Sequence, residues 1–200
     1  MARTGRPRAF DEHQALTRAR DLFWSRGYAA TSVQDLVDEL KVQRGSLYAA
    51  FGDKRNLYLK AVALYAQENR ERLEAMLGAG PVLPVLRRML TEPASLTGAQ
   101  EGVERRRGCL VGNTTAELLP RDEQAGTLVA AAFEAFIQTV AAALRRGQET
   151  GEIATTATPE AQAHMLLMLF QGAALVSRAQ PAHDQFVAGI DAALDALREH

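Results

Sequence analysis

Apolar residues recur at helical spacing along almost the whole chain, and this periodicity limits the fold more than any other feature. Few segments alternate between apolar and polar residues, and Ala, Leu, Glu and Arg, all good helix formers, are abundant. Proline, glycine and capping residues divide the chain into about nine helical segments. These segments are expected at 11–26, 33–40, 44–50, 53–77, 82–91, 104–119, 122–150, 159–180 and 183–198. The chain is therefore predicted to be all-α.

Length and composition exclude several classes of protein. A chain of 200 residues forms one large domain or two small ones, and 47% apolar with 24% charged residues is the balance of a globular protein. The single cysteine, Cys109, excludes an internal disulfide framework and a Cys-rich zinc module. No uncharged apolar run of about 18 residues predicts a membrane span, and no apolar stretch follows the basic amino terminus as in a secretory signal. We expect a cytoplasmic protein.

Charge is distributed unevenly along the chain. Residues 1–60 hold 11 Lys or Arg and 7 Asp or Glu, whereas residues 61–200 hold 12 and 17. A basic amino-terminal third indicates a polyanionic partner at that end, although a solvated surface is the alternative. The arm at residues 3–8 carries three arginines and is of the kind that enters a DNA minor groove. A disordered tail is the alternative for the arm.

The segment 31–51 has the layout of a helix-turn-helix motif. A short amphipathic helix is followed by a sharp break and by a second short helix that starts with small and polar residues. The second helix of such a motif lies in a major groove about 12 Å wide, so its leading face is neither bulky nor apolar. Gly45 and Ser46 permit close approach, and Gln43 and Arg44 are suited to adenine and guanine edges. An exposed helix start without DNA is the alternative.

Four further residues of this region are predicted to contact phosphates. Tyr48 offers a hydroxyl, Lys54 offers a charge at the start of a helix, and Thr31 and Ser32 offer hydroxyls and amides at another helix start. The alternatives are a core aromatic with an exposed edge for Tyr48 and simple helix caps for Thr31 and Ser32.

A longer pattern surrounds these residues. It consists of Leu22, Phe23, Gly27, Tyr28, Thr31, Ser32, Val33, Leu36, Gly45, Ser46, Leu47, Tyr48, Phe51, Lys54 and Leu57. This pattern resembles the amino-terminal signature of the TetR family of transcriptional repressors over residues 10–60. The resemblance implies a homodimer with a helix-turn-helix DNA-binding domain at 1–52. It also implies a larger helical domain at 53–200 that binds an effector and dimerises, linked through the helix at about 53–77.

The resemblance also implies roles for individual residues. The DNA-binding residues that it implies are Thr31, Ser32, Gln43, Arg44, Gly45, Ser46, Leu47, Tyr48 and Lys54, with 43–47 as the base-facing recognition helix. Two positions depart from the pattern. The family often has glycine where Lys41 stands, so this turn requires strain or a different geometry. The family often has serine or threonine where Gln43 stands, so the helix cap is weaker while a base-contacting side chain is gained.

The last two helical segments are rich in apolar residues on one side. These faces consist of Met165, Met168, Leu169, Gly172 and Leu175 on the first and Phe186, Ile190, Leu194 and Leu197 on the second. Two such helices from each of two chains form a four-helix bundle, so we expect a homodimer through the last two helices. A two-fold protein also suits palindromic DNA. Packing within one chain is the alternative.

A small-molecule effector is expected among the central helices. Its predicted binding residues are Leu86, Leu90, Cys109, Phe133, Phe136, Ile137, Met165 and Phe170. Methionine and aromatic walls favour an apolar or aromatic effector, and ordinary core packing is the alternative for each residue.

Cys109 has a second interpretation. Three arginines at 105–107 precede it, and nearby cations and a helix start favour the thiolate. The stretch 107–110 with Asn113 and Glu117 resembles a subgroup of the family, some members of which respond to reactive compounds. A redox- or electrophile-sensing thiol is therefore one hypothesis, and a buried packing cysteine is the other.

The sequence shows no arrangement typical of an enzyme. It contains no nucleophile-and-base pair, phosphate loop or metal-ligand spacing, and its four histidines are scattered. We therefore predict no catalytic residues, metal or cofactor. The predicted function is a sequence-specific DNA-binding regulator, a repressor released from a palindromic operator by a small-molecule effector. The alternatives are a repressor that senses through Cys109 and a helical interaction module that binds no DNA.

Overall fold

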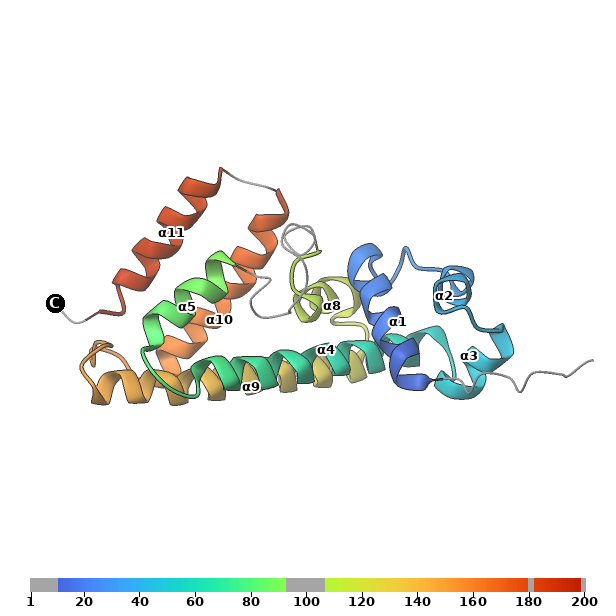
Figure 1. Ribbon diagram of the computed structural model, residues 1–200, viewed down its shortest axis with the longest axis horizontal. Coiled ribbons are helices and arrows are strands. Elements are labelled where there is room, and N and C mark those ends of the chain that lie inside the picture. Colours follow the sequence, from blue (N-terminus) through green and yellow to red (C-terminus); the bar gives the residue numbers. More distant parts are fainter. Residues whose placement is uncertain (1–10, 93–106, 180–181, 199–200) are drawn as a thin grey trace, which may run out of the picture. The chain divides into compact units, whose positions relative to one another are not determined.

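The computed structural model describes residues 11–92, 107–179 and 182–198. These ranges contain nine α-helices, one 3₁₀ turn and no strand, which confirms the predicted all-α class (Figure 1). The basic arm at 3–8 and two of the three arginines before Cys109 lie outside the described residues.

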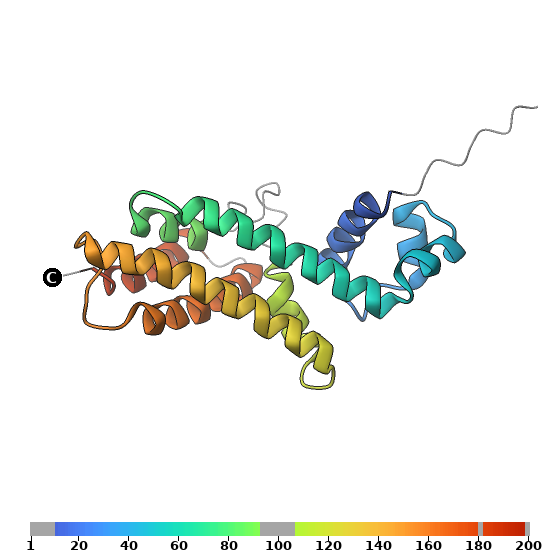
Figure 2. The same ribbon diagram turned by 90° about the horizontal axis from the view of Figure 1, so that it is seen from below.

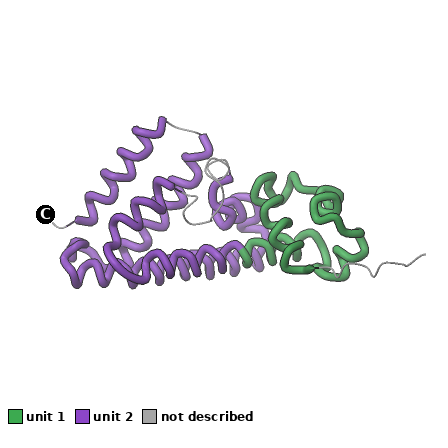
Figure 3. Tube along the Cα trace, viewed as in Figure 1, with its two compact units in different colours: residues 1–64 green, residues 65–200 purple. Residues whose placement is uncertain are grey.

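The chain divides into two compact units, and the division falls within one helix. Unit 1 comprises residues 1–64 and unit 2 comprises residues 65–200 (Figure 3). The division lies inside α4 (Lys54–Leu77), whereas the sequence predicted a boundary between residues 52 and 53. Helix α4 therefore contributes residues to both units, and the predicted boundary stays a prediction.

Unit 1 contains three helices before α4. They are α1 (Glu12–Arg26), α2 (Val33–Leu40) and α3 (Arg44–Phe51). The ring of Tyr58 on α4 meets Phe23 of α1 edge to face, with centroids 5.0 Å apart, and lies 4.8 Å from the ring of Tyr28. Such aromatic pairs contribute roughly 0.5–1.5 kcal/mol each beyond their burial. Because isolated helices of this length are marginal in water, α2 and α3 depend on this core.

The turn between α2 and α3 has an unusual backbone conformation. Lys41 ends α2 with φ 55° and ψ 42°, in the left-handed region, and its N–H donates to the carbonyl of Val37. Among the described residues outside glycine, it is the one with a positive φ. A side chain in this region costs roughly 1–2 kcal/mol, so the turn carries strain at the position where the sequence predicted strain or a different geometry.

Unit 2 contains the remainder of α4, five further α-helices and a short 3₁₀ turn among the described residues. The helices are α5 (Val82–Thr91), α8 (Leu110–Leu118), α9 (Glu123–Glu149), α10 (Pro159–Val176) and α11 (His183–Asp195), and the 3₁₀ turn is Ser177–Ala179. Helix α9 packs against α8 and α10, and α11 packs against α5 (Figures 1 and 2). One core cluster joins buried residues of α4, α5, α9, α10 and α11.

The apolar face of α11 was predicted to meet a second copy of the chain, but it packs within the chain. Ile190 and Leu194, together with Leu197 after the helix, are buried in the same core as Leu86 and Leu90 of α5. The alternative that the sequence left open is therefore correct for this face, because α5 supplies the apolar surface that covers it.

Predicted helix boundaries differ most from the structure at two helix ends. The helix expected at 104–119 begins at Leu110 among the described residues, because Gly108 has φ 67° and Cys109 is extended. The helix expected at 159–180 ends at Val176 and continues as the 3₁₀ turn. Both differences lie at helix ends, where single residues decide whether the backbone continues.

Helix α9 departs from the expectation that nothing spans a membrane. The mean hydropathy of an 18-residue window in α9 is 1.7. By length and composition alone, this helix could cross a membrane. The core helix of a soluble protein passes the same test, and α9 packs against α8, α10 and α5. The composition of α9 is therefore weak support for a membrane span.

Substituting Lys41→Gly tests the strain in the α2–α3 turn. Glycine adopts the left-handed conformation without a Cβ clash but gains freedom in the unfolded chain. We expect the free energy of unfolding, measured by urea denaturation and circular dichroism, to rise by about 0.5–1 kcal/mol. Lys41→Ala removes the same charge but retains a Cβ, so it should give no increase. An equal gain in both variants would contradict strain at this residue.

Candidate nucleic-acid interface and ligand cavity

Helix α3 presents a polar amino-terminal face on an apolar base. Gln43, Arg44, Gly45 and Ser46 are exposed, as the sequence predicted for a base-facing helix start. Leu47, which was predicted to face bases as well, is 2% exposed and belongs to the core of unit 1. It lies one turn before Phe51, which is also buried, so helical periodicity directs both side chains inward. Leu47 therefore supports the face and is not part of it.

The surface around Gly45 is open. A Cβ placed on Gly45 would meet no other atom within 4 Å. Gly45 also lies within α3, where glycine is a poor helix former, so the fold itself gives no reason for glycine there. The absence of a side chain instead leaves the backbone of α3 accessible to an outside partner.

Arg44 and Tyr48 lie one turn apart on α3 and contact each other. The Arg44 Nη2 donates to the Tyr48 hydroxyl at 3.4 Å, and the guanidinium carbon lies 5.8 Å from the centroid of the Tyr48 ring. Tyr48 is 38% exposed, so it is not the core aromatic that was the alternative interpretation. Gln43, which precedes α3, makes no side-chain cap, consistent with the weakened cap that the sequence predicted.

The start of α2 is closed by its own residues. Thr31 is 0% exposed and its hydroxyl donates to the carbonyl of Gly27 at 2.7 Å, so its side chain is not at the surface where a phosphate contact was predicted. Ser32 is exposed but forms a capping box with Asp35. Hydrogen bonds from Ser32 hold the pKa of the Asp35 carboxyl below its ordinary value, and Arg26 adds to this effect. Ser32 therefore caps α2, whereas the Thr31 hydroxyl is bound to the backbone of Gly27, and their phosphate contacts stay a prediction.

Lys54 begins α4, and its ammonium group has a defined neighbour. Its Nζ lies 4.3 Å from the centroid of the Tyr28 ring, a cation–π distance. Asp53 caps the same helix by accepting a hydrogen bond from the amide of Asn56 at 2.7 Å. The Lys54 charge is thus held at the first turn of α4, where backbone amides point outward.

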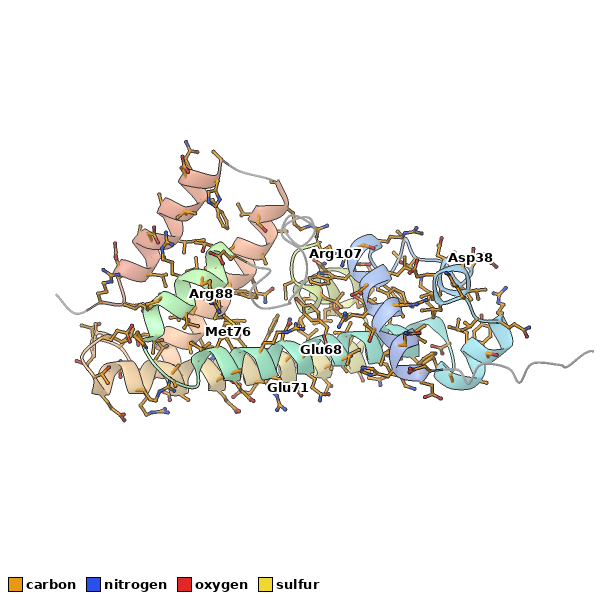
Figure 4. All side chains as sticks on the ribbon, in the orientation of Figure 1. Asp38, Glu68, Glu71, Met76, Arg88 and Arg107 are labelled. Atoms are coloured by element: carbon orange, nitrogen blue, oxygen red, sulfur yellow. The ribbon has the colours of Figure 1, made fainter. Side chains whose placement is uncertain are left out.

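Unit 2 contains a small cavity that is partly open to solvent, among the side chains that its helices direct into the space between them (Figure 4). Its volume is about 60 Å³. The cavity is lined by Tyr65, Ala66, Asn69, Arg70, Leu73, Cys109, Val111, Ala132, Phe133, Phe136, Leu167, Phe170 and Gln171. Most of these side chains are apolar, and the polar ones come from α4, from α10 and from Cys109, which directly precedes α8.

The cavity includes half of the predicted effector-binding residues. Cys109, Phe133, Phe136 and Phe170 line it. The other four do not line it. Leu86, Leu90 and Ile137 are core residues, and Met165 is exposed on α10. Helical spacing identifies which residues face inward but not which inward face borders a space.

Sequence reasoning missed the polar wall. Tyr65, Asn69 and Leu73 lie at four-residue spacing on α4, so they share one side of that helix. The sequence signal for this wall was a polar residue, Asn69, one helical turn from each of two buried residues, Tyr65 and Leu73. Gln171 on α10 was missed because no sequence motif or residue spacing marks it.

Tyr65 and Cys109 are the centre of a hydrogen-bonded group. Burial raises the pKa of the Tyr65 hydroxyl well above 10, and the neighbouring Cys109 raises it further. The hydroxyl is hydrogen-bonded to the side chains of Asn69 and Cys109 and to the backbone of Leu110. The Gln171 Nε2 donates to Cys109 Sγ at 3.6 Å. Cys109 is buried, and its role as a sensor of reactive compounds stays a prediction.

Two family models match the chain. The model described as bacterial regulatory proteins, tetR family, matches residues 15–61, and the model described as tetracyclin repressor-like, C-terminal domain, matches residues 86–193. The second model alone spans more than half of the chain.

Individual proteins are similar over different shares of their length. The uncharacterized HTH-type transcriptional regulator YezE of Bacillus subtilis is 35% identical over 121 residues, which are 60% of this chain and 61% of YezE. The HTH-type transcriptional repressor DhaR of Mycobacterium sp. is 28% identical over 180 residues, 88% of each chain. A cysteine mutant of the TetR family regulator CifR, solved with 26-base-pair operator DNA, is 30% identical with a TM-score of 0.75. That match covers 96% of this chain and 100% of the CifR chain.

Proposed function

Because the chain belongs to the tetR family of bacterial regulatory proteins, we propose that it is a transcriptional repressor that a small molecule releases from its operator. The family consists of DNA-binding regulators rather than enzymes, and its members act as dimers. As a soluble regulator of this kind, the protein acts in the cytoplasm in our proposal.

The observation that carries this proposal is the surface of α3. Its exposed start combines Gln43, Arg44 and Ser46 with the open backbone at Gly45, and Leu47 and Phe51 anchor the opposite side. Such a helix enters a major groove without steric conflict and offers amide, guanidinium and hydroxyl groups to base edges. Tyr48 beside Arg44 and Lys54 at the start of α4 are the proposed phosphate contacts.

Release by an effector is proposed to act through α4. This one helix supplies Lys54 at its first turn and five of the residues that line the cavity in unit 2. A ligand that displaces the lining part of α4 also displaces its first turn, because a helix transmits such a shift along its axis. A ligand must favour the released state by a few kcal/mol to empty the operator.

Selection from random duplexes tests the proposed function. The purified full-length protein is mixed with random double-stranded DNA at low salt, and bound duplexes are sequenced. We expect an enriched palindrome whose half-sites are about one helical turn apart, as two recognition helices of a dimer require. Failure to enrich any motif would contradict DNA recognition and favour the helical interaction module.

Arg44→Ala and Lys54→Ala are expected to weaken binding to the selected palindrome in different ways. Arg44→Ala should relax preference at one base pair by about 1–3 kcal/mol, because a base-edge contact is lost. Lys54→Ala should weaken binding to all sequences alike. It should also reduce the slope of log affinity against log salt concentration by about one, because one phosphate contact is lost. Fluorescence anisotropy with matched and mismatched duplexes separates the two effects. Equal losses on every duplex for both variants would refute the assigned roles.

Gly45→Ala tests whether glycine is needed for DNA rather than for the fold. The added Cβ meets no protein atom, so stability should stay the same or rise by up to about 0.5–1 kcal/mol. Operator affinity should fall by about tenfold, because the methyl group lies between the helix and the bases. Gly126→Ala is the matched control, since a Cβ there also meets nothing within 4 Å. Unchanged affinity in Gly45→Ala would show that the backbone does not approach DNA closely.

The proposed dimer face is the exposed side of α10. Met168 and Leu175 are each 68% exposed, and Met165 and Val176 are also exposed large apolar residues. A Cβ on Gly172 of the same helix would meet nothing within 4 Å, which leaves room for a close partner helix. Contiguous exposed apolar residues on a soluble protein indicate an interaction site. The outer surface of α11 completes this face in our proposal.

Leu175→Glu should convert the dimer to a monomer. A carboxylate buried at the centre of an apolar interface costs several kcal/mol without a partner charge. Sedimentation equilibrium should therefore show the mass of one 21.8 kDa chain instead of two. Ala142→Glu places the same charge on an exposed position of α9 and should leave the dimer intact. A dimer that persists in Leu175→Glu would place the interface elsewhere.

A further inference from the structure

The cavity of unit 2 has an apolar part and a polar end. Phe133, Phe136 and Phe170 lie in its apolar part, with the Phe136 and Phe170 ring centroids 5.6 Å apart. Tyr65, Asn69, Cys109 and Gln171 form a group of polar wall residues, which we call the polar end. One water molecule needs a cavity of about 10–15 Å³. The cavity of about 60 Å³ therefore holds a molecule of a few heavy atoms.

One acceptor at the polar end lacks a donor. Tyr65 is hydrogen-bonded to Asn69, Cys109 and the backbone of Leu110, and the Gln171 amide donates to Cys109. The Asn69 Oδ1 is buried and has no hydrogen-bond partner. A buried acceptor left in this state costs about 1–3 kcal/mol. This acceptor is therefore open to a donor from outside the chain.

Gly112 on α8 keeps the polar end in this arrangement. A Cβ on Gly112 would lie 2.4 Å from the Oε1 of Gln171, so any larger residue would displace that amide from its place over Cys109. The hydrogen bond from Gln171 to Cys109 thus depends on the close approach of Gln171 to Gly112.

The wall provides no free charge for an ionic ligand. Arg70 is the charged residue among those lining the cavity, and its Nε lies 3.7 Å from the Glu74 carboxylate in an exposed ion pair. An anion that entered the cavity would lose its hydration without gaining a buried cation. An uncharged ligand avoids this cost.

We propose that the cavity binds a small uncharged molecule that carries a hydroxyl or N–H group on a short apolar body. Asn69 Oδ1 accepts the hydrogen bond from that group, and the three phenylalanines contact the apolar body. This inference rests on the proposed function, in which a small molecule acts on unit 2, and it specifies the chemical class of that molecule.

Binding of three matched probes to the full-length protein tests this inference. Cyclopentanol carries a donor, cyclopentanone has the same ring with an acceptor alone, and butyrate is anionic. Ligand-observed NMR titration gives the dissociation constant of each probe. We expect cyclopentanol to bind about fivefold to tenfold more tightly than cyclopentanone, because a matched hydrogen bond replaces an unpaired acceptor. Butyrate should bind more weakly than both.

Two variants assign the preference to its residue. Asn69→Leu has similar volume but no acceptor, so cyclopentanol and cyclopentanone should then bind equally. Ala132→Leu fills the cavity from α9 and should abolish binding of both probes. Circular dichroism and thermal melting establish that each variant is folded.

Several outcomes would overturn the proposed ligand class. These are tighter binding of cyclopentanone or butyrate, no binding of any probe, or a preference for cyclopentanol that survives in Asn69→Leu. The titration uses protein without DNA, so its result does not depend on repression. A failure of the proposed function would appear separately, as the absence of an enriched palindrome in the duplex selection.

Discussion

Helix α4 is the element on which both parts of the protein depend. It is one helix of 24 residues, and it places Leu57 and Tyr58 in the core of unit 1 and Leu73 and Leu77 in the core of unit 2. Neither core is complete without these side chains. A helix that two cores share cannot change position without a cost in both, and the proposed release of DNA by a ligand is assigned to α4 for this reason.

The two candidate sites satisfy their polar groups in opposite ways. At the start of α2, Ser32 and Asp35 hydrogen-bond each other, so this helix end is stable without a partner. In the cavity, Asn69 Oδ1 is buried without a partner while its neighbours are matched. Unpaired buried groups are rare in folded proteins, and they are tolerated where a ligand supplies the missing bond. The start of α2 is thus satisfied by its own residues, whereas the acceptor in the cavity is not.

Much of the fold and part of the site were predictable from the sequence. The helix starts at Val82 and Pro159 agree with the residues predicted, and α1 begins one residue after the predicted Asp11, which caps it, because local caps and proline determine these ends. The exposed positions 43–46 of α3 also follow from local pattern. The motif groups Leu47 with its exposed neighbours, but the side chain is buried, because burial depends on what the other helices place beneath it.

The sequence by itself determined the all-α class, the positions of most helices and the helix-turn-helix layout. Each of these depends on residues close together in the chain, through periodicity, capping and backbone sterics. Only the tertiary structure decided that α11 covers α5, that α10 keeps an exposed apolar face, and that Tyr65, Asn69, Cys109 and Gln171 share one cavity wall. These facts depend on contacts between residues far apart in the chain, and helical spacing does not specify which faces meet.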